Sequence, residues 1–137
     1  MYIANQGAPS CYYVNHSGSA SKQEQGGFFW LRLIGAPDSP VQVGSRKLSS
    51  TKDAVGARVT VYTAGGQMVR EVQGGMGFAS QSEHALHFGV PDATAVERIT
   101  IQWPSGRVQE LAADAARALL NKHSRIIEIE ELAQRGK

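Results

Sequence analysis

The sequence has little cysteine and no long apolar run. Cys11 is the only cysteine, so an intrachain disulfide is excluded, although many exported domains also lack disulfides. No apolar run approaches the roughly 20 residues of a transmembrane helix, so we expect no membrane span. The first ten residues have neither a basic region nor an apolar core, so they are not a signal peptide. If the protein is exported, we expect its signal in sequence that is not present here.

A strong charge of one sign is also missing. The chain has 14 basic and 12 acidic residues, a net charge of +2 that does not by itself indicate nucleic-acid binding. One local excess groups Arg46, Lys47, Lys52 and Arg58 around Asp53. Such a run is typical of a solvated loop, and it leaves nucleic-acid binding through the Arg46–Arg58 loop as an alternative function. The length of 137 residues indicates one domain with a core of its own.

Alternating apolar residues predict strands in the middle of the chain. Val55–Thr63 places Val55, Ala57, Val59 and Val61 on one face, which is typical of a strand in a sheet that is wet on one side. A tight turn of the primed type at Ala64–Gln67 leads to a return strand over Gln67–Gln73.

Two further strands have the same alternation. The first is predicted over His84–Val90, with Leu86 and Phe88 on the core face and His87 on the opposite face. The second is predicted over Val96–Trp103. The inward residues of both strands predict one buried cluster, formed by Leu86, Phe88, Ile99, Ile101 and Trp103. Tight turns explain another set of residues, Gly65, Gly66, Gly75, Gly77, Pro104 and Gly106.

The flanking segments complete the pattern. We expect strands over Phe28–Ile34, Arg107–Leu111 and Ile126–Ile129, the last followed by a charged tail. A long surface loop covers Gly35–Lys52, with a short edge strand at Val41–Val43. A helix over Ala112–Asn121 should be anchored by Leu119 and Leu120.

These elements predict a mainly β fold. We expect an antiparallel β-sandwich or open barrel of about seven to eight strands with one short C-terminal helix. The β domain should cover residues 28–132, after a polar, glycine-flanked linker at 19–27 and before a tail at 133–137.

Several motifs in order give the chain a family resemblance. Between Phe29 and Glu110 it resembles the ASPIC/UnbV domain, the C-terminal module of cartilage acidic protein-like proteins with FG-GAP propellers. The matching pieces are Trp30–Leu33, Val55–Val59, Arg70–Val72, Gly74–Phe78, Ser80–Gln81, His87–Gly89 and Trp103–Arg107.

The N-terminus carries a second resemblance. Ile3–Ser10 and Tyr12–Asn15 are similar to the end of an FG-GAP repeat, so residues 1–18 are predicted to be a remnant of a propeller-type repeat. The two resemblances imply a propeller neighbour, an extracellular or periplasmic setting in bacteria, and binding of an unknown protein or carbohydrate. They imply no catalysis and no cofactor.

The candidate ligand-binding residues come from the motifs and from one aromatic side chain. Trp30 faces away from Leu31 and Leu33, so it is a candidate platform for a sugar ring or a partner. The other candidates lie within the family motifs: Arg58, Arg70, Ser80, Gln81 and His87.

Catalysis and metal binding have weaker support. Ser80 with a histidine contains the ingredients of a hydrolase, but the sequence has no nucleophile elbow. His84 and His87 are three residues apart, which on a strand would place them on opposite faces, so we expect no shared metal.

The N-terminal segment has no lysine or arginine to discourage edge pairing. We expect residues 1–15 either to fold back onto the sandwich or to pair with the same segment of a second chain, giving a homodimer.

Overall fold

The computed structural model describes residues 2–3, 9, 11–12, 27–75, 81–90, 95–120 and 126–132. Within these residues the chain forms strands and one helix. In chain order they are β1 Tyr2–Ile3, β2 Cys11–Tyr12, β3 Gly27–Ile34, β4 Val41–Val43, β5 Arg46–Leu48, β6 Arg58–Thr63, β7 Gly66–Glu71, β8 Leu86–Val90, β9 Val96–Gln102, β10 Val108–Ala112, α1 Ala113–Leu120 and β11 Ile126–Glu130.

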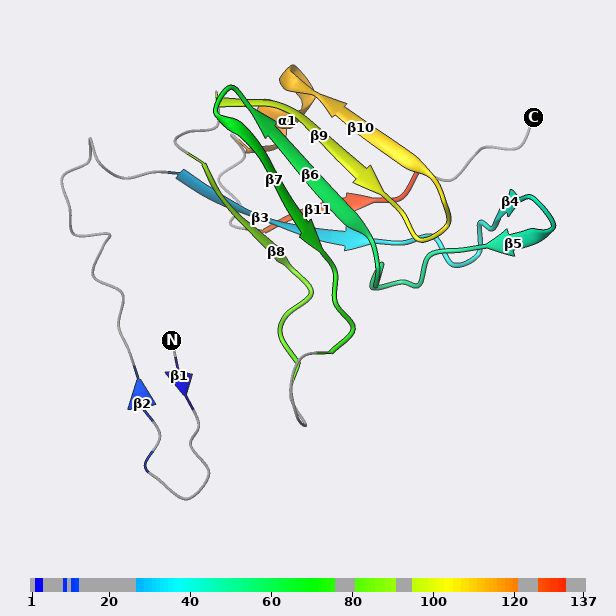
Figure 1. The fold of residues 1–137 in the computed structure, drawn as a ribbon, viewed down its shortest axis with the longest axis horizontal. Coiled ribbons are helices and arrows are strands. Elements are labelled where there is room, and N and C mark those ends of the chain that lie inside the picture. Colours follow the sequence, from blue (N-terminus) through cyan, green and yellow to red (C-terminus); the bar gives the residue numbers. More distant parts are fainter. Residues whose placement is uncertain are drawn as a thin grey trace.

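Two sheets make the body of the domain. One has the strand order β10-β9-β6-β7, and the other has the order β11-β3-β8. Figure 1 shows the four-stranded sheet lying over the three-stranded one, with α1 at one end against β9 and β10. The predicted mainly β fold with one short helix is therefore confirmed, and the arrangement is consistent with a β-sandwich.

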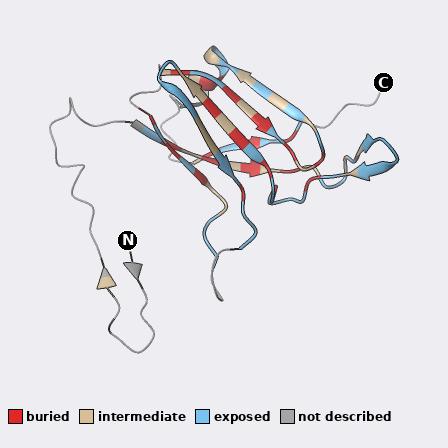
Figure 2. Ribbon diagram, viewed as in Figure 1, coloured by how far each residue is buried: buried red, intermediate tan, exposed pale blue. Residues whose placement is uncertain are grey.

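The inward faces of both sheets form one hydrophobic core. Every second residue is buried in β3 and β8, as period-2 alternation requires, and Figure 2 shows these buried positions along the strands. In β9 the alternation holds from Ile99 onward, because the register shifts near Val96. The predicted cluster of Leu86, Phe88, Ile99, Ile101 and Trp103 is confirmed, and Phe88 is fully buried within it. Its ring stacks on that of Phe29, with centroids 5.3 Å apart.

One strand pair is parallel rather than antiparallel. β11 pairs with β3 in parallel, with Ile126 opposite Trp30 and Glu130 opposite Ile34. The remaining strand pairs of the two large sheets are antiparallel. Parallel neighbours need a long crossover connection, and here nearly the whole domain lies between the two strands. The last strand therefore pairs with the first strand of the domain.

The predicted strand Val55–Thr63 begins three residues too early. The observed strand starts at Arg58, and Val55 is 37% exposed rather than buried. Ala54 has a φ of 50° and Gly56 a φ of 88°, so the backbone leaves the extended region before the strand begins. Ala54 is fully buried in place of Val55.

The predicted turn glycines differ in their backbone conformations. Gly66 has a φ of 133° and Gly106 a φ of 87°, whereas Gly65 and Gly75 are not among the glycines with positive φ. A primed turn would need positive φ at Ala64 or Gly65, so that prediction is wrong, and Gly66 takes the unusual conformation as β7 begins. Pro104 lies in the turn between β9 and β10, closed by the Gly106 N–H donating to the Trp103 carbonyl at 2.9 Å. Gly77 lies outside the described residues.

The predicted surface loop Gly35–Lys52 contains a hairpin. Its expected strand Val41–Val43 is present as β4 and pairs with β5 in a separate two-stranded sheet, which Figure 1 shows projecting from the body. The two ends of this segment lie together, because the Gly35 N–H donates to the Lys52 carbonyl at 3.0 Å. A Cβ on Gly35 would lie 2.1 Å from the Thr51 carbonyl oxygen, so only glycine fits at this crossing.

The helix prediction is confirmed in part, and the N-terminal predictions are not tested. α1 is slightly shorter than the predicted Ala112–Asn121, and its buried residue is Ala116. The side chains of Leu119 and Leu120 lie outside the description. β1 and β2 pair with each other and with no other strand in the described part of the chain. Most of residues 1–15 is not described, so their association with a second chain stays a prediction.

The helix found in the described residues is too short and too polar to cross a membrane.

Candidate functional site

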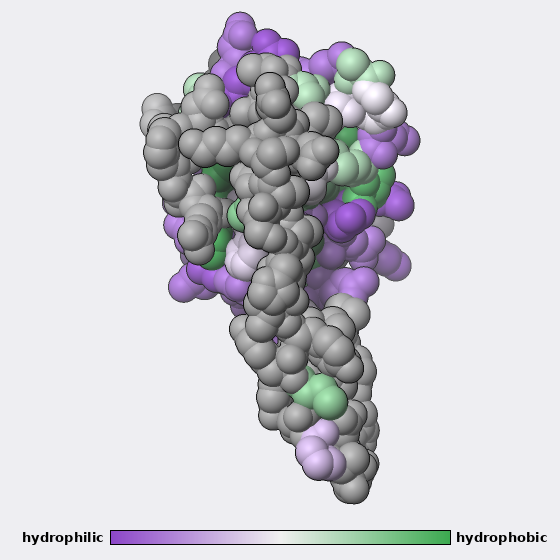
Figure 3. Space-filling model, turned by 90° about the vertical axis from the view of Figure 1, so that its left-hand side faces the viewer, coloured by the Kyte–Doolittle hydropathy of each residue, from purple (hydrophilic) through white to green (hydrophobic). Residues whose placement is uncertain are grey.

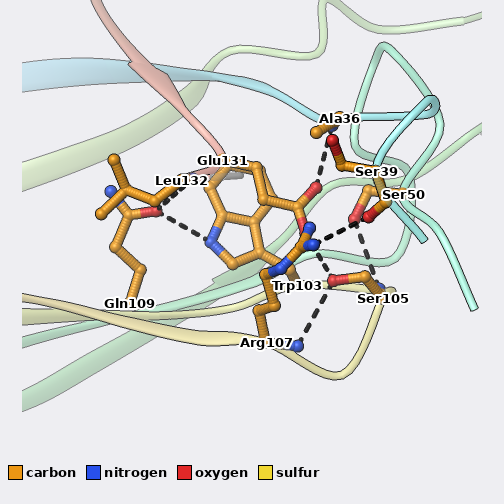
Figure 4. A network of polar contacts seen from close by, with 9 residues as sticks. All are labelled: Ala36, Ser39, Ser50, Trp103, Ser105, Arg107, Gln109, Glu131 and Leu132. Atoms are coloured by element: carbon orange, nitrogen blue, oxygen red, sulfur yellow. Dashed lines mark hydrogen bonds and ion pairs between the residues drawn. The ribbon is translucent and has the colours of Figure 1, made fainter. Parts of the chain in front are cut away.

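A buried carboxylate joins four segments at one end of the domain. The Glu131 side chain is fully buried and follows β11 directly. It accepts hydrogen bonds from the Ala36 N–H at 2.9 Å, from Arg107 Nη1 at 2.9 Å and from the Ser105 hydroxyl. Figure 4 shows these groups converging on Glu131. We call the set Ala36, Ser39, Ser50, Ser105, Arg107 and Glu131 the Glu131 network.

The other members of the network hold the base of the β4–β5 hairpin. Arg107 Nη2 donates to the Ser39 carbonyl at 2.8 Å, and the Ser105 N–H donates to the buried Ser50 hydroxyl at 3.3 Å. Burial alone would raise the pKa of Glu131. Hydrogen bonds from Ser105, Ala36 and Ser50, together with Arg107, outweigh burial and lower this pKa below its ordinary value. Glu131 is therefore ionised and fully partnered, which is the state of a structural carboxylate rather than of a general acid or base.

A second feature is a row of rings on the outer face of the three-stranded sheet. Trp30 on β3 lies directly opposite His87 on β8, and their rings meet edge to face with centroids 5.8 Å apart. The ring of Phe28 lies 5.5 Å from His87, and Phe28 is 58% exposed. We call Phe28, Trp30 and His87 the aromatic ladder. Trp30 Nε1 is buried and has no hydrogen-bond partner in the described part of the chain.

A hollow of about 340 Å³ lies at the open side between the two sheets. One wall comes from the end of β7 and the residues after it, and the other wall comes from the segment that leads into β8. We call it the seam hollow. Its lining includes Arg70, Glu71, Glu83, His84 and His87. His87 lines the seam hollow and belongs to the aromatic ladder, so the two features adjoin at this residue.

Figure 3 views the molecule from the side where β3 begins, with hydrophobic and hydrophilic residues side by side on this face. A second hollow of about 300 Å³ adjoins the first through His84, and it is lined by Arg32, Lys52, Asp53 and Glu128 among others. Arg32 is paired with Glu83 at 2.6 Å and lies 3.8 Å from Glu128. Arg32 and its two acidic partners are half-exposed and already paired, so Arg32 has less charge to offer a ligand than an arginine without an ion pair.

The model of the ASPIC and UnbV family matches residues 47–125, which is more than half of the chain. The chain belongs to the ASPIC and UnbV family. No curated protein and no solved structure matches it. Membership in the ASPIC and UnbV family is consistent with an accessory module of a larger protein. The FG-GAP remnant over residues 1–18 is not part of the match and stays a prediction.

The ASPIC and UnbV match does not cover the whole folded unit. It runs from the middle of β5 to the residue before β11, and leaves out β3 and β11. These two strands supply two of the three strands of one sheet, as well as Trp30 and Glu131. The matched motif Trp103–Arg107 now has a structural explanation, because Ser105 and Arg107 are the partners of Glu131. Trp103 packs in the core and its Nε1 donates to Gln109 at 3.1 Å.

The structure brings some of the sequence-predicted site residues together. Arg70 and His87 line the same seam hollow, and Trp30 reaches it through His87. Gln81 is hydrogen-bonded to His84, which lines the hollow. Arg58 lies apart, on the outer face of the four-stranded sheet opposite Glu71 and Gln102. Ser80 lies outside the described residues.

His84 and His87 lie at the same hollow, although their spacing predicted opposite faces of a strand. Strand β8 begins only at Leu86, so the alternation of faces does not extend back to His84. Both histidines line the seam hollow. In the described ranges, no three histidine, cysteine, aspartate or glutamate side chains group in a way that would hold a metal ion.

The basic run Arg46–Arg58 does not lie on one element. Arg46 and Lys47 are on β5, Lys52 lines the second hollow, and Arg58 is on β6. Glu131 is a structural residue that is absent from the predicted site, because the predicted closing strand ends at Ile129 and charged residues follow it. A signal was present: Ile127, Ile129 and Glu131 follow the period of two that places all three on the buried face.

Proposed function

We propose that this domain is a non-catalytic accessory module of a larger exported protein, and that it binds a carbohydrate on the aromatic ladder. The exposed Phe28 ring beside His87 and Trp30 carries this proposal. Sugar rings have apolar C–H faces and polar hydroxyl edges. An exposed ring for stacking, here Phe28, with polar groups next to it matches both properties.

The aromatic ladder has those polar groups at its side. His87 belongs to the ladder and also lines the seam hollow. The hollow has hydrogen-bond donors and acceptors on Arg70, Glu83 and His84, and His84 is in turn hydrogen-bonded to Gln81. A sugar stacked on Phe28 would thus have hydrogen-bonding partners within reach of its hydroxyl groups. Binding sites commonly combine apolar walls with a few such polar groups.

A protein ligand has less support than a carbohydrate. Stable protein interfaces need roughly 800 Å² of surface from each partner, with a hydrophobic centre. Among the described residues the exposed large apolar side chains are spread over different segments: Phe28, Val43, Val55, Val108 and Leu132. Val108 and Leu132 line one hollow of about 180 Å³ near the end of β3, whereas Phe28 lies at the start of that strand, so these side chains do not form a single contact area.

Nucleic-acid binding and hydrolysis are also less favoured. Phosphate backbones bind to clustered cations, and the four basic residues from Arg46 to Arg58 are divided among three places in the fold. A hydrolase would need Ser80 next to a polarised histidine. Ser80 lies outside the described residues, and His87 has rings on both of its sides rather than a carboxylate.

Binding to an array of neutral and acidic glycans tests the proposal. We expect the protein to bind at least one class of glycan, and Phe28→Ala to reduce that binding by about tenfold through loss of a stacking face. Val108→Ala is the matched control, because Val108 is 66% exposed on the edge strand β10, outside the ladder. The proposal is wrong if no glycan binds, or if the two variants bind alike.

A further inference from the structure

We infer that the ligand is an acidic oligosaccharide, in which Arg70 holds a uronic acid carboxylate in the seam hollow while a neighbouring sugar lies on the aromatic ladder. The inference rests on the proposed carbohydrate binding and adds the charge of the ligand and the residue that recognises it. Arg70 and the ladder are linked by His87, which borders both.

Among the described residues, Arg70 is positioned by neutral groups only. Its Nη1 donates to the Val69 carbonyl at 2.9 Å, and its guanidinium carbon lies 5.9 Å from the centre of the Phe88 ring. Phe88 belongs to the opposite sheet, so Arg70 reaches across the open side of the sandwich. Both contacts fix the guanidinium in place, and neither neutralises its charge.

The other arginines with acidic neighbours are already paired. Arg32 pairs with Glu83, Arg98 with Glu110, and Arg107 with Glu131. In the part of the chain that the structure describes, Arg70 has no carboxylate partner, although it lines a hollow with two glutamates. A guanidinium has five N–H donors, and the contact with Val69 uses one of them.

Neither glutamate of the seam hollow forms an ion pair with Arg70. Glu83 accepts from Arg32 at 2.6 Å. Glu71 is adjacent to Arg70 in strand β7, so its side chain lies on the opposite face, where its cross-strand neighbour is Arg58. The charge of Arg70 therefore remains available to an anion that enters the hollow.

The chemistry of Arg70 favours a carboxylate. Its planar N–H fork matches the two oxygens of a carboxylate, and such bidentate pairs are among the strongest hydrogen bonds in proteins. The hollow of about 340 Å³ is near the lower end of the usual ligand range of about 300–1,000 Å³. A hollow of this size suits one sugar unit, and the next unit along the chain then meets His87, Phe28 and Trp30.

The test compares acidic oligosaccharides with their own neutral methyl esters. Isothermal titration uses oligomers of galacturonate, glucuronate and mannuronate, each as the free acid and as the ester. We expect at least one free acid to bind about tenfold or more tightly than its ester. Arg70→Gln should reduce the affinity for the acid to that of the ester, and Arg70→Lys should restore only part of the difference.

Two controls separate this inference from the function on which it rests. Arg58→Gln removes another exposed arginine that has no ion pair in the described residues, and it should keep the preference for the acid. Phe28→Ala should reduce the affinity for the acid and the affinity for the ester by the same factor. Thermal unfolding of each variant checks that the fold is intact.

The outcomes are distinct. If acid and ester bind equally, or if Arg70→Gln keeps the preference, the inference is wrong while carbohydrate binding stands. If sodium sulfate at low millimolar concentration displaces the acid as well as an oligomer does, Arg70 is a simple anion site and the inference is wrong. If no acidic or neutral glycan binds at all, the proposed function itself fails.

Discussion

Ser105 and Glu131 lie 26 residues apart in the chain, yet the Ser105 hydroxyl donates a buried hydrogen bond to the Glu131 carboxylate. Ser105 sits in the turn between β9 and β10, and Glu131 follows the last strand. The bond therefore ties the four-stranded sheet to the end of the three-stranded sheet. Through Ala36 and Arg107, the same carboxylate also fixes the base of the β4–β5 hairpin.

Glu131→Gln should lower the free energy of unfolding by about 3–5 kcal/mol, the range for removing one partner of a buried ion pair. The amide leaves Arg107 without a counter-charge, and Arg107 is only 12% exposed. Denaturation in urea measures the loss. Glu130→Gln is the matched control, because Glu130 is exposed and should change stability by less than about 0.5 kcal/mol. Equal stability of the two variants would contradict the structural role of Glu131.

Stability should also depend on pH through Glu131. Its pKa is lower in the folded protein than the ordinary value of 4.5, so the unfolded chain takes up the proton first as the pH falls. The stabilisation is complete above 4.5 and is lost as the pH falls through the folded-state pKa. Urea unfolding from about pH 6 to about pH 3 should show a smaller acid-dependent loss in Glu131→Gln than in the wild type. Parallel curves would show that Glu131 is not the group responsible.

Phe88→Ala should cost about 3–5 kcal/mol, as for other large aromatic side chains removed from a core. Phe88 is fully buried between the sheets and stacks on Phe29. Phe28→Ala removes the same ring from the outer face and should cost less than about 1 kcal/mol. The denaturation midpoints of Phe88→Ala and Phe28→Ala are compared with that of the wild type, and the larger decrease is expected for Phe88→Ala. A small loss in Phe88→Ala would mean that the two sheets do not pack as described.

Gly66→Val should destabilise the domain by about 1–3 kcal/mol, because a β-branched residue resists the φ of 133° at this position. No atom lies within 4 Å of a Cβ built on Gly66, so the cost is one of backbone strain and not of a clash. Gly65→Val is the control, since Gly65 has ordinary φ and no backbone contact near its Cβ. A denaturation midpoint unchanged from the wild type in Gly66→Val would contradict the described conformation.

Much of the fold follows from the sequence because β3 and β8 alternate strictly between inward and outward residues. In β8 and β9 each apolar residue at an even spacing is buried, so the face of Phe88 and Ile101 was predictable from period alone. The turn at Pro104–Gly106 was predictable from the residue types. The start of β6 was not, because Val55 fits the alternation although Ala54 and Gly56 leave the extended conformation.

The remaining features depend on contacts between distant segments. No local pattern says that β11 pairs with β3, because that pairing is set by the whole sandwich. The partner of Arg70 is likewise a ring on another sheet, Phe88. Glu131 looks like one more acid in a charged tail until its position relative to Ile127 and Ile129 is counted. The seam hollow was therefore only partly predictable, through the motif residues Arg70 and His87.

The parallel pairing of β3 with β11 also has a consequence for how the chain is made. Within the domain, β3 leaves the ribosome before the other strands of the two large sheets, and its neighbour β11 and the carboxylate of Glu131 emerge after them, so the three-stranded sheet is incomplete until synthesis of the domain has finished. Pairings between such distant segments slow folding, because a long loop must close before the contact contributes. Until then β3 exposes one unpaired edge. Nascent chains stalled before residue 126 should accordingly bind chaperones, whereas chains released after residue 132 should fold.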